Sequence, residues 1–253
     1  MSVSSRTICR LSALTVAALA TLSALSATAT ATGPSPISGG TPVQRGEYPW
    51  LVHVAGNMGG TWNVRCTGAL ITARHVLTAA HCTAKNPADA GYAYVDFGVA
   101  NGLASRVQVT TTLRHPSARA DATKADAAIW TLAQPVSVPH IPLVLGNDTK
   151  YYKTGTALIL AGYGRTDGNG PAPQQAPVTV QATCRQDPIW FCAKTSSDTQ
   201  GARPGDSGAP VFAKAGTQYV LVGVTGSHSG TKHWFTRLAT PLVNEWIRKT
   251  AVP

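Results

Sequence analysis

The stretch Gly205-Asp206-Ser207-Gly208-Ala209-Pro210 separates a polar loop from the apolar run Val211–Phe212. Glycines near the serine let the backbone adopt positive φ values and leave the Ser207 side chain unshielded. Successive backbone N–H groups in such a loop can point at one spot and bind an anion. The same residue types also favour ordinary surface turns. Alone, the stretch therefore predicts either a nucleophile loop or a plain turn.

Two further segments place a histidine and an aspartate in apolar surroundings. Leu77-Thr78-Ala79-Ala80-His81-Cys82 carries the histidine, and Ala125-Asp126-Ala127-Ala128-Ile129-Trp130 carries the aspartate. A serine hydroxyl needs a base such as His81, and that base needs a partner that fixes its tautomer. Asp126 is predicted as this partner, because a carboxylate at the head of an apolar strand is costly to bury alone. The alternatives are a purely structural His81 and, for the acid, Asp121, whose neighbours predict an exposed loop.

These segments resemble the chymotrypsin-like (trypsin-fold) serine proteases, whose histidine lies in Thr-Ala-Ala-His-Cys and whose serine lies in Gly-Asp-Ser-Gly-Gly-Pro. The order His81, Asp126, Ser207 matches that family and differs from the subtilisin and α/β-hydrolase orders. The resemblance implies an all-β fold of two six-stranded antiparallel β-barrels with a C-terminal helix. It also implies a serine endopeptidase that needs no cofactor, with an oxyanion hole formed by the N–H groups of Gly205 and Ser207.

Short β-rich runs broken by turns agree with an all-β fold. The runs are Trp50–Val54, Cys66–Thr72, Tyr92–Val99, Ser105–Leu113, Ala127–Leu132, Ala157–Ala161, Val178–Cys184, Ala209–Phe212, Tyr219–Thr225 and His233–Arg237. We expect a peptidase domain over 37–253, with an N-terminal barrel over about 37–140 and a C-terminal barrel over about 141–238. Thr240-Pro241 predicts the start of a helix over about 240–250 that packs through Leu242, Val243, Trp246 and Ile247.

Composition narrows the class of protein. Of the 253 residues 13% are charged and 43% hydrophobic, which indicates a globular fold with a sizeable core. The net charge is +10, yet the sequence holds no run of three basic residues and no clustered basic or aromatic platform for nucleic acid. No spacing of metal ligands stands out either. We expect a monomer that binds no nucleic acid, and the resemblance implies protein or peptide substrates.

Residues 1–31 predict a secretory signal peptide. Arg6 and Arg10 precede the apolar run Leu11–Leu25, and small residues follow up to Ala31. The run is too short and too rich in serine and threonine for a membrane anchor. Residues 32–36 then predict a short propeptide or spacer. The expected product is a secreted, extracellular protein without membrane attachment.

Cysteine usage agrees with export. Cys9 leaves with the signal peptide, and the four remaining cysteines, an even number, predict disulfides. Three connectivities are possible. The pairs Cys66–Cys82 and Cys184–Cys192 each close a short loop and are the pairs that the resemblance implies. The first loop would contribute about 3 kcal/mol to stability in the chain-entropy model.

Ile37-Ser38-Gly39-Gly40 is similar to the Ile-Val-Gly-Gly N-terminus that the family exposes on activation. The resemblance implies a zymogen in which the freed amine of Ile37 pairs with buried Asp206. However, Pro36 stands where the family has arginine or lysine, so a trypsin-type activator is not expected to cut there. Either another protease releases Ile37, or the chain starts a few residues earlier and assembles its site differently.

The predicted substrate pocket also departs from the family. Gly201, six residues before Ser207, stands where trypsin-like members carry an aspartate that binds arginine or lysine, so the preference is expected to be non-tryptic. One alternative is a small or apolar pocket floored by Gly201 and Ala202. The other is that Arg203 or His228 faces the pocket and attracts acidic residues.

Two other functions are compatible with these residues. A folded but inactive protease-like binding protein would account for the altered activation segment and pocket. An esterase could use the same triad on a substrate that is not a peptide.

Overall fold

The computed structural model describes Met1 and residues 36–57, 62–84, 93–96, 106–120, 124–144, 146–164, 172–182, 184 and 187–251. The predicted signal peptide beyond Met1, the spacer up to residue 35, and Asp121 lie outside the described residues. In the described part of the chain, no helix is both long and apolar enough to cross a membrane.

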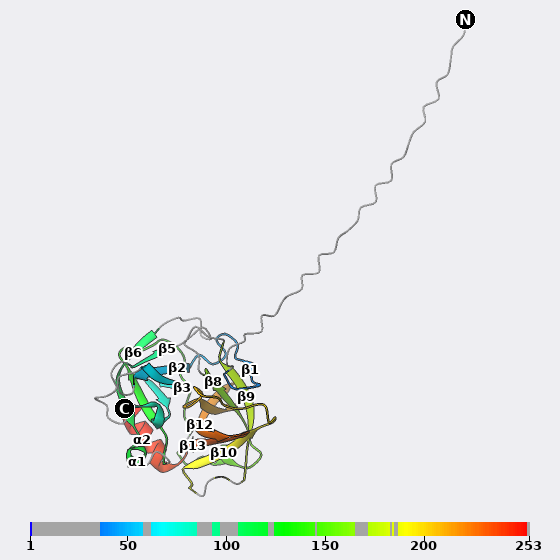
Figure 1. Cartoon of the computed structure of the whole chain (residues 1–253). Helices are drawn as coiled ribbons and strands as arrows, with labels where there is room; N and C mark the ends of the chain where they lie inside the picture. Colours follow the sequence, from blue (N-terminus) through cyan, green and yellow to red (C-terminus); the bar gives the residue numbers. More distant parts are fainter. Residues whose placement is uncertain are drawn as a thin grey trace. The chain divides into compact units, whose positions relative to one another are not determined.

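Six antiparallel strands form a closed barrel in the order β2-β3-β4-β7-β6-β5. Figure 1 labels β2, β3, β5 and β6 of this barrel. They are β2 (Leu51–Asn57), β3 (Trp62–Thr72), β4 (His75–Thr78), β5 (Ala93–Asp96), β6 (Arg106–Arg114) and β7 (Ala128–Leu132). The start of β6 shows why these residues form a strand, because exposed Arg106 and Gln108 alternate with buried Val107 and Val109. Closing the sheet leaves this barrel without free edges.

The second sheet contains β1 (Thr41–Pro42), β8 (Ala157–Gly162), β9 (Gln174–Val180), β10 (Trp190–Thr195), β11 (Pro210–Ala215), β12 (Gln218–Ser229) and β13 (Lys232–Arg237). Strand β8 pairs with both β11 and β9, so six of the strands close into a ring and β1 is added beside β9. All of these pairings are antiparallel. The predicted fold of two six-stranded antiparallel barrels is therefore confirmed.

The helices are few and short. In the ranges that the structure describes, they are α1 (Pro116–Ala120), α2 (Pro241–Ala251) and the 3-10 helices η1 (Ala80–Cys82) and η4 (Lys150–Tyr152). Helix α2 begins at Pro241, as expected, and buries Val243 and Ile247 on one face. The expectation that Leu242 packs is wrong, since 55% of this residue is exposed. An α-helix turns by about 100° per residue, so Leu242 points away from the stripe that Val243 and Ile247 form.

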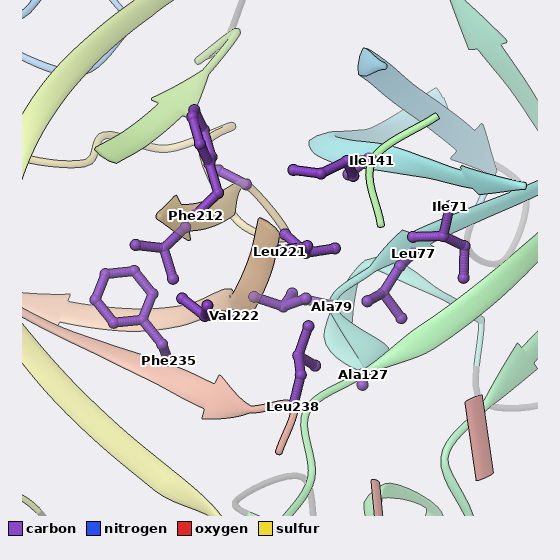
Figure 2. Packing of buried hydrophobic residues seen from close by; sticks show 14 of the residues in the cluster. Ile71, Leu77, Ala79, Ala127, Ile141, Phe212, Leu221, Val222, Phe235 and Leu238 are labelled. Carbon is purple, nitrogen blue, oxygen red and sulfur yellow. The ribbon is translucent and has the colours of Figure 1, made fainter. Parts of the chain in front are cut away.

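One buried apolar cluster runs through both barrels. Figure 2 shows members from the first barrel, such as Leu77, together with Phe212, Leu221 and Phe235 from the second. The segment between the barrels binds to each of them, because the N–H of Ile141 donates to Leu70 and that of Val144 donates to Leu221, at 3.0 Å each. The shared core holds the loops at the junction of the barrels in place.

Candidate active site

His81 and Asp126 are brought together by strand pairing within the first barrel. His81 lies in η1, just after β4, and Asp126 lies just before β7. Thr78 at the end of β4 is paired with Ala128 at the start of β7. As a result, Asp126 Oδ1 accepts a hydrogen bond from the His81 backbone N–H at 2.9 Å, and Oδ2 lies 2.7 Å from His81 Nδ1.

The two partners differ in exposure. The Asp126 side chain is 5% exposed, whereas the His81 side chain is 37% exposed. Within the described residues, the other ring nitrogen of His81, Nε2, has no hydrogen bond. A buried carboxylate thus holds one side of the imidazole and leaves the other side for a substrate or nucleophile.

The backbone around Asp126 is unusual. Ala125 has a φ of +40°, which is rare for a residue with a Cβ, and the N–H of Ala127 donates to the Ala125 carbonyl at 2.6 Å. The second barrel supports this turn, because the Thr236 hydroxyl donates to the Asp126 carbonyl at 3.1 Å. Gly226 lies close to the acid, since a Cβ there would be 3.2 Å from Asp126 Oδ2. Strained backbone of this kind is common where geometry serves function.

The loop that carries Ser207 lies against the first barrel. The Ser207 carbonyl accepts a hydrogen bond from the Thr67 N–H of β3 at 2.8 Å. Gly208 has a φ of +78°, and a Cβ there would overlap Thr78 Oγ1 and lie 2.8 Å from the Ala79 nitrogen. Only glycine fits this position, which brings Ser207 beside the segment that leads into η1.

Along this loop, N–H groups that donate a hydrogen bond alternate with N–H groups that have no acceptor among the described residues. Those of Asp206 and Gly208 donate to carbonyl oxygens at 2.9 Å each. Across the described ranges, the N–H groups of Gly205 and Ser207 have no acceptor, and the Ser207 hydroxyl has no hydrogen bond. Gly205 has a φ of +99°, which glycine alone adopts freely. Two unused donors beside a serine can bind a developing negative oxygen.

Asp206 faces the segment that precedes the first barrel. Its Oδ2 accepts from the N–H groups of Ile37 at 3.1 Å and of Arg203 at 2.8 Å, and its Oδ1 accepts from Gly164 at 2.8 Å. Ile37 and Asp206 are both fully buried. Burial raises the pKa of Asp206 to about 6, although these hydrogen bonds oppose the rise. In this chain Pro36 precedes Ile37, so the donor is a peptide N–H.

Two disulfides are present, Cys66–Cys82 and Cys184–Cys192, which are the pairs that the resemblance implies. The first ties β3 to η1, so the residue after His81 is held covalently. The indole N–H of Trp130 in β7 also donates to the Thr83 hydroxyl at 2.8 Å. The position of His81 is thus fixed from two sides.

A pocket of about 160 Å³ lies beside the Ser207 loop. It is lined by Asp198, Thr199, Gln200, Gly201, Ala202, Arg203, His228 and Gly230, which include all three residues predicted for the substrate pocket. Buried His233 was not among the predicted site residues, although a Cβ on Gly201 would lie 3.2 Å from the His233 ring. The available signal was a histidine directly before two aromatic residues, Trp234 and Phe235, in a predicted strand. Throughout the described residues, no group of three or more His, Cys, Asp or Glu side chains could hold a metal ion.

Known proteins resemble this chain over most of its length. The family model described as Trypsin matches residues 37–247. Chymotrypsin-like elastase family member 1 of Bos taurus is 30% identical over 219 residues, which cover 75% of this chain and 77% of that protein. The protein of the same name from Macaca fascicularis is 29% identical over 247 residues, which cover 85% and 89%. Proclotting enzyme of Tachypleus tridentatus is 28% identical over 228 residues, which cover 74% of this chain and 58% of that protein. The chain therefore belongs to the trypsin family, the chymotrypsin-like serine proteases.

Proposed function

We propose that this chain is a secreted serine endopeptidase that hydrolyses peptide bonds through an acyl-enzyme on Ser207. The observation that supports the proposal most is the packing of the Ser207 loop against the chain segment that leads to His81. The imidazole of His81 is held by Asp126 at 2.7 Å. Ser207 lies on a loop packed against the segment before η1, and two N–H groups of this loop have no acceptor among the residues described. Membership of a family of serine proteases supports the same chemistry.

The reaction course follows from these groups. Ser207 Oγ attacks the carbonyl carbon of a peptide bond, and His81 Nε2 takes the hydroxyl proton. Asp126 keeps the Nδ1–H in place and stabilises the imidazolium without becoming protonated. The carbonyl oxygen becomes an oxyanion and accepts hydrogen bonds from the N–H groups of Gly205 and Ser207. Loss of one such donor typically costs about 100- to 1000-fold in kcat.

Collapse of the tetrahedral intermediate breaks the C–N bond, and His81 returns its proton to the leaving amine. A water molecule then attacks the Ser207 ester by the same route and regenerates the hydroxyl. Named side chains and water handle every proton and electron pair in this course, so the proposal calls for no cofactor.

We also propose that the chain is made as a zymogen. The free amine of Ile37 would place a cation where a peptide N–H now meets Asp206 at 3.1 Å, which would stabilise the buried carboxylate. Because Pro36 precedes Ile37, the releasing peptidase is not of the type that cuts after arginine or lysine. The uncharged Gly201 in the pocket supports a non-tryptic preference.

Labelling with a fluorophosphonate probe tests the proposal. The secreted protein and its Ser207→Ala variant are treated with the probe, intact masses are measured, and the N-termini are sequenced. We expect one adduct on a chain that begins at Ile37 and no adduct on the variant. A chain that begins at Ile37 but takes up no probe would contradict the proposal and favour the binding-protein function. Labelling with hydrolysis of esters but not of peptides would favour the esterase.

A further inference from the structure

A buried histidine behind the pocket lacks a partner. His233 in β13 is fully buried, and neither of its ring nitrogens has a hydrogen-bond partner in the part of the chain that the structure describes. A buried polar group without a partner is costly, so its presence calls for an explanation. Its ring faces Gly201, where a Cβ would lie 3.3 Å from His233 Nε2. Since Gly201 lines the pocket, the imidazole lies directly behind the pocket wall.

A second histidine connects this ring to the pocket surface. His228 in β12 is the cross-strand partner of His233 in β13, and the centres of the two rings are 5.9 Å apart. His228 is exposed and lines the pocket. The pair therefore extends from the pocket into the protein interior.

Charges around the pair are unevenly distributed. Partial burial, and then the positive charge of Arg203, lower the pKa of His228. Burial, and then His228, lower the pKa of His233 to about 4. Arg203 lines the pocket beside them, and its guanidinium also donates to the Ser38 hydroxyl at 2.8 Å. The acidic side chain of the lining is Asp198, which neighbours Thr199 and Gln200 and does not contribute to either histidine's pKa shift.

The pocket is placed to receive a substrate side chain next to Ser207. One wall runs directly into the serine loop, because the Arg203 N–H binds Asp206 at 2.8 Å. The other wall contains His228, which comes two residues after Gly226 in β12. Gly226 lies against the Asp126 carboxylate. A volume of about 160 Å³ is small beside pockets for whole drug-sized ligands, and suits one side chain.

We propose that this pocket binds the carboxylate of a glutamate or aspartate that immediately precedes the cleaved bond, with His228 as its direct partner. His233 lies behind His228 and supports the His228 ring from the protein interior. Arg203 adds positive charge at the rim of the pocket. This inference rests on the proposed function and assigns its substrate class. It favours the acidic alternative left open by the sequence over the apolar one.

Binding of the substrate carboxylate is coupled to the uptake of a proton by His228. A carboxylate that enters the pocket favours the charged form of the nearby imidazole, so a proton from solvent binds to His228 as the substrate docks. The contact then becomes a charge-assisted hydrogen bond, which is about twice as strong as a neutral one. The other titratable or charged groups near His228 are Arg203 and Asp198 in the pocket lining and His233 behind it. Arg203 contributes an attraction that persists when the histidines are neutral.

Peptides that differ only in the residue before the cut test the proposal. Glutamate, glutamine, leucine and lysine peptides are compared by kcat/KM. We expect the glutamate peptide to exceed the glutamine peptide at least about tenfold, and His228→Gln to remove most of that ratio. His140→Gln is the matched control, because His140 is exposed and does not line the pocket. The glutamate-to-glutamine ratio should also rise from about pH 8 to about pH 6.

The outcomes separate this inference from the proposed function. Ser207→Ala protein binds peptides without cleaving them, so calorimetry with the glutamate and glutamine peptides reads the pocket even if no fluorophosphonate adduct forms. Tighter binding of glutamate in Ser207→Ala, lost when His228→Gln is added, supports the pocket. A preference for leucine, or equal binding of glutamate and glutamine, overturns it. A preference for lysine also overturns it and identifies Asp198 as the determinant.

Discussion

The two barrels build their parts of the candidate site from different kinds of contact. In the first barrel, His81 meets Asp126 because adjacent strands β4 and β7 pair, and the disulfide to Cys82 lies next to the histidine. In the second, the Ser207 loop depends on distant segments. Ile37 binds Asp206 across 169 positions of sequence. The base and its acid are therefore built into one barrel, whereas the nucleophile loop is held by other parts of the chain.

This difference predicts two kinds of variant. A change in the His81–Asp126 pair should remove chemistry and leave stability nearly intact. A change beneath the Ser207 loop should cost stability and activity together, because the loop loses the contacts that order it.

The largest expected effect is that of Asp126→Asn. An asparagine amide in place of Oδ2 would present a donor to His81 Nδ1, which lies at 2.7 Å, and so favour the tautomer with its proton on Nε2. That nitrogen could then no longer take the Ser207 proton. We expect kcat to fall about 10⁴-fold at neutral pH, measured with an ester and a peptide substrate. Urea unfolding provides the control, and a loss of activity below tenfold would contradict this role.

The second prediction concerns Gly208→Ala. The Cβ of an alanine there would overlap Thr78 Oγ1, and the alanine would have to adopt a φ of +78°. Overlap and left-handed backbone together should cost about 4 kcal/mol of unfolding free energy. Gly216→Ala is the matched control, because Gly216 has a φ of +65° with open space around it and should cost only about 1 kcal/mol. Equal losses in urea melts would show that the Ser207 loop does not need its close contact with the first barrel.

The third prediction uses Asp206 to test dependence on the chain before the first barrel. With Pro36 retained, the pKa of folded Asp206 is about 6 against an ordinary value of 3.8. Its contribution to stability is therefore fully present below the ordinary value and is lost as pH rises through 6. The loss amounts to about 3 kcal/mol.

A chain released from a fusion so that it begins at Ile37 carries an ammonium group at this point, which should lower the pKa of Asp206 and reduce the loss. Urea unfolding between about pH 4 and pH 8 compares the two chains. His233, whose pKa is lowered to about 4, contributes the opposite trend in both chains and cancels in the difference. Asp206→Asn in the longer chain should abolish its extra pH dependence. Identical curves would mean that the cation does not reach Asp206.

Much of the candidate site could be predicted from local sequence, but little of its surroundings could. His81, Asp126 and Ser207 lie in short motifs whose residues the resemblance could match. His233 could not be found in this way, because its importance arises from pairing with His228 and from the missing Cβ of Gly201. These relations join three segments and exist only in the folded chain.

The strands show the same limit. All ten predicted runs overlap observed strands, but β1, β4 and β10 were not predicted. Strand β4 has only four residues, and β10 includes Lys194 among its apolar residues. The run Val178–Cys184 was placed too late, since β9 spans Gln174–Val180. The start of β9 is polar and contains Pro177, and proline is usually unfavourable in a paired strand. Pro177 pairs with Ile159 of β8 on one side only. On the other side, β1 pairs with Gln174 and Gln175, and β10 pairs only from Val178 onward, so Pro177 lies between these two pairings.

The smallest prediction concerns Thr67, a first-barrel residue that supports the second barrel's loop. Its buried hydroxyl donates to the Gly205 carbonyl and accepts from the Tyr163 N–H, both at 3.0 Å. Thr67→Val keeps the shape of the side chain but leaves two buried backbone groups unpaired, which should cost about 2 kcal/mol. Without this anchor on its carbonyl, Gly205 is held less firmly, and its own N–H is one of the two proposed oxyanion donors. We therefore expect kcat to fall about tenfold while KM changes little.

Thr110→Val is the matched control, because the Thr110 hydroxyl donates to the Thr131 carbonyl at 3.2 Å on an exposed part of β6. It should cost less than about 0.5 kcal/mol and leave kcat unchanged. If Thr67→Val lowers stability but not kcat, then the Gly205 peptide is held by the loop itself. The Ser207 loop would then depend on distant segments through its other contacts, such as that of Ile37 with Asp206 and that of Gly208 with Thr78. If both fall together, the first barrel orders the oxyanion donors directly.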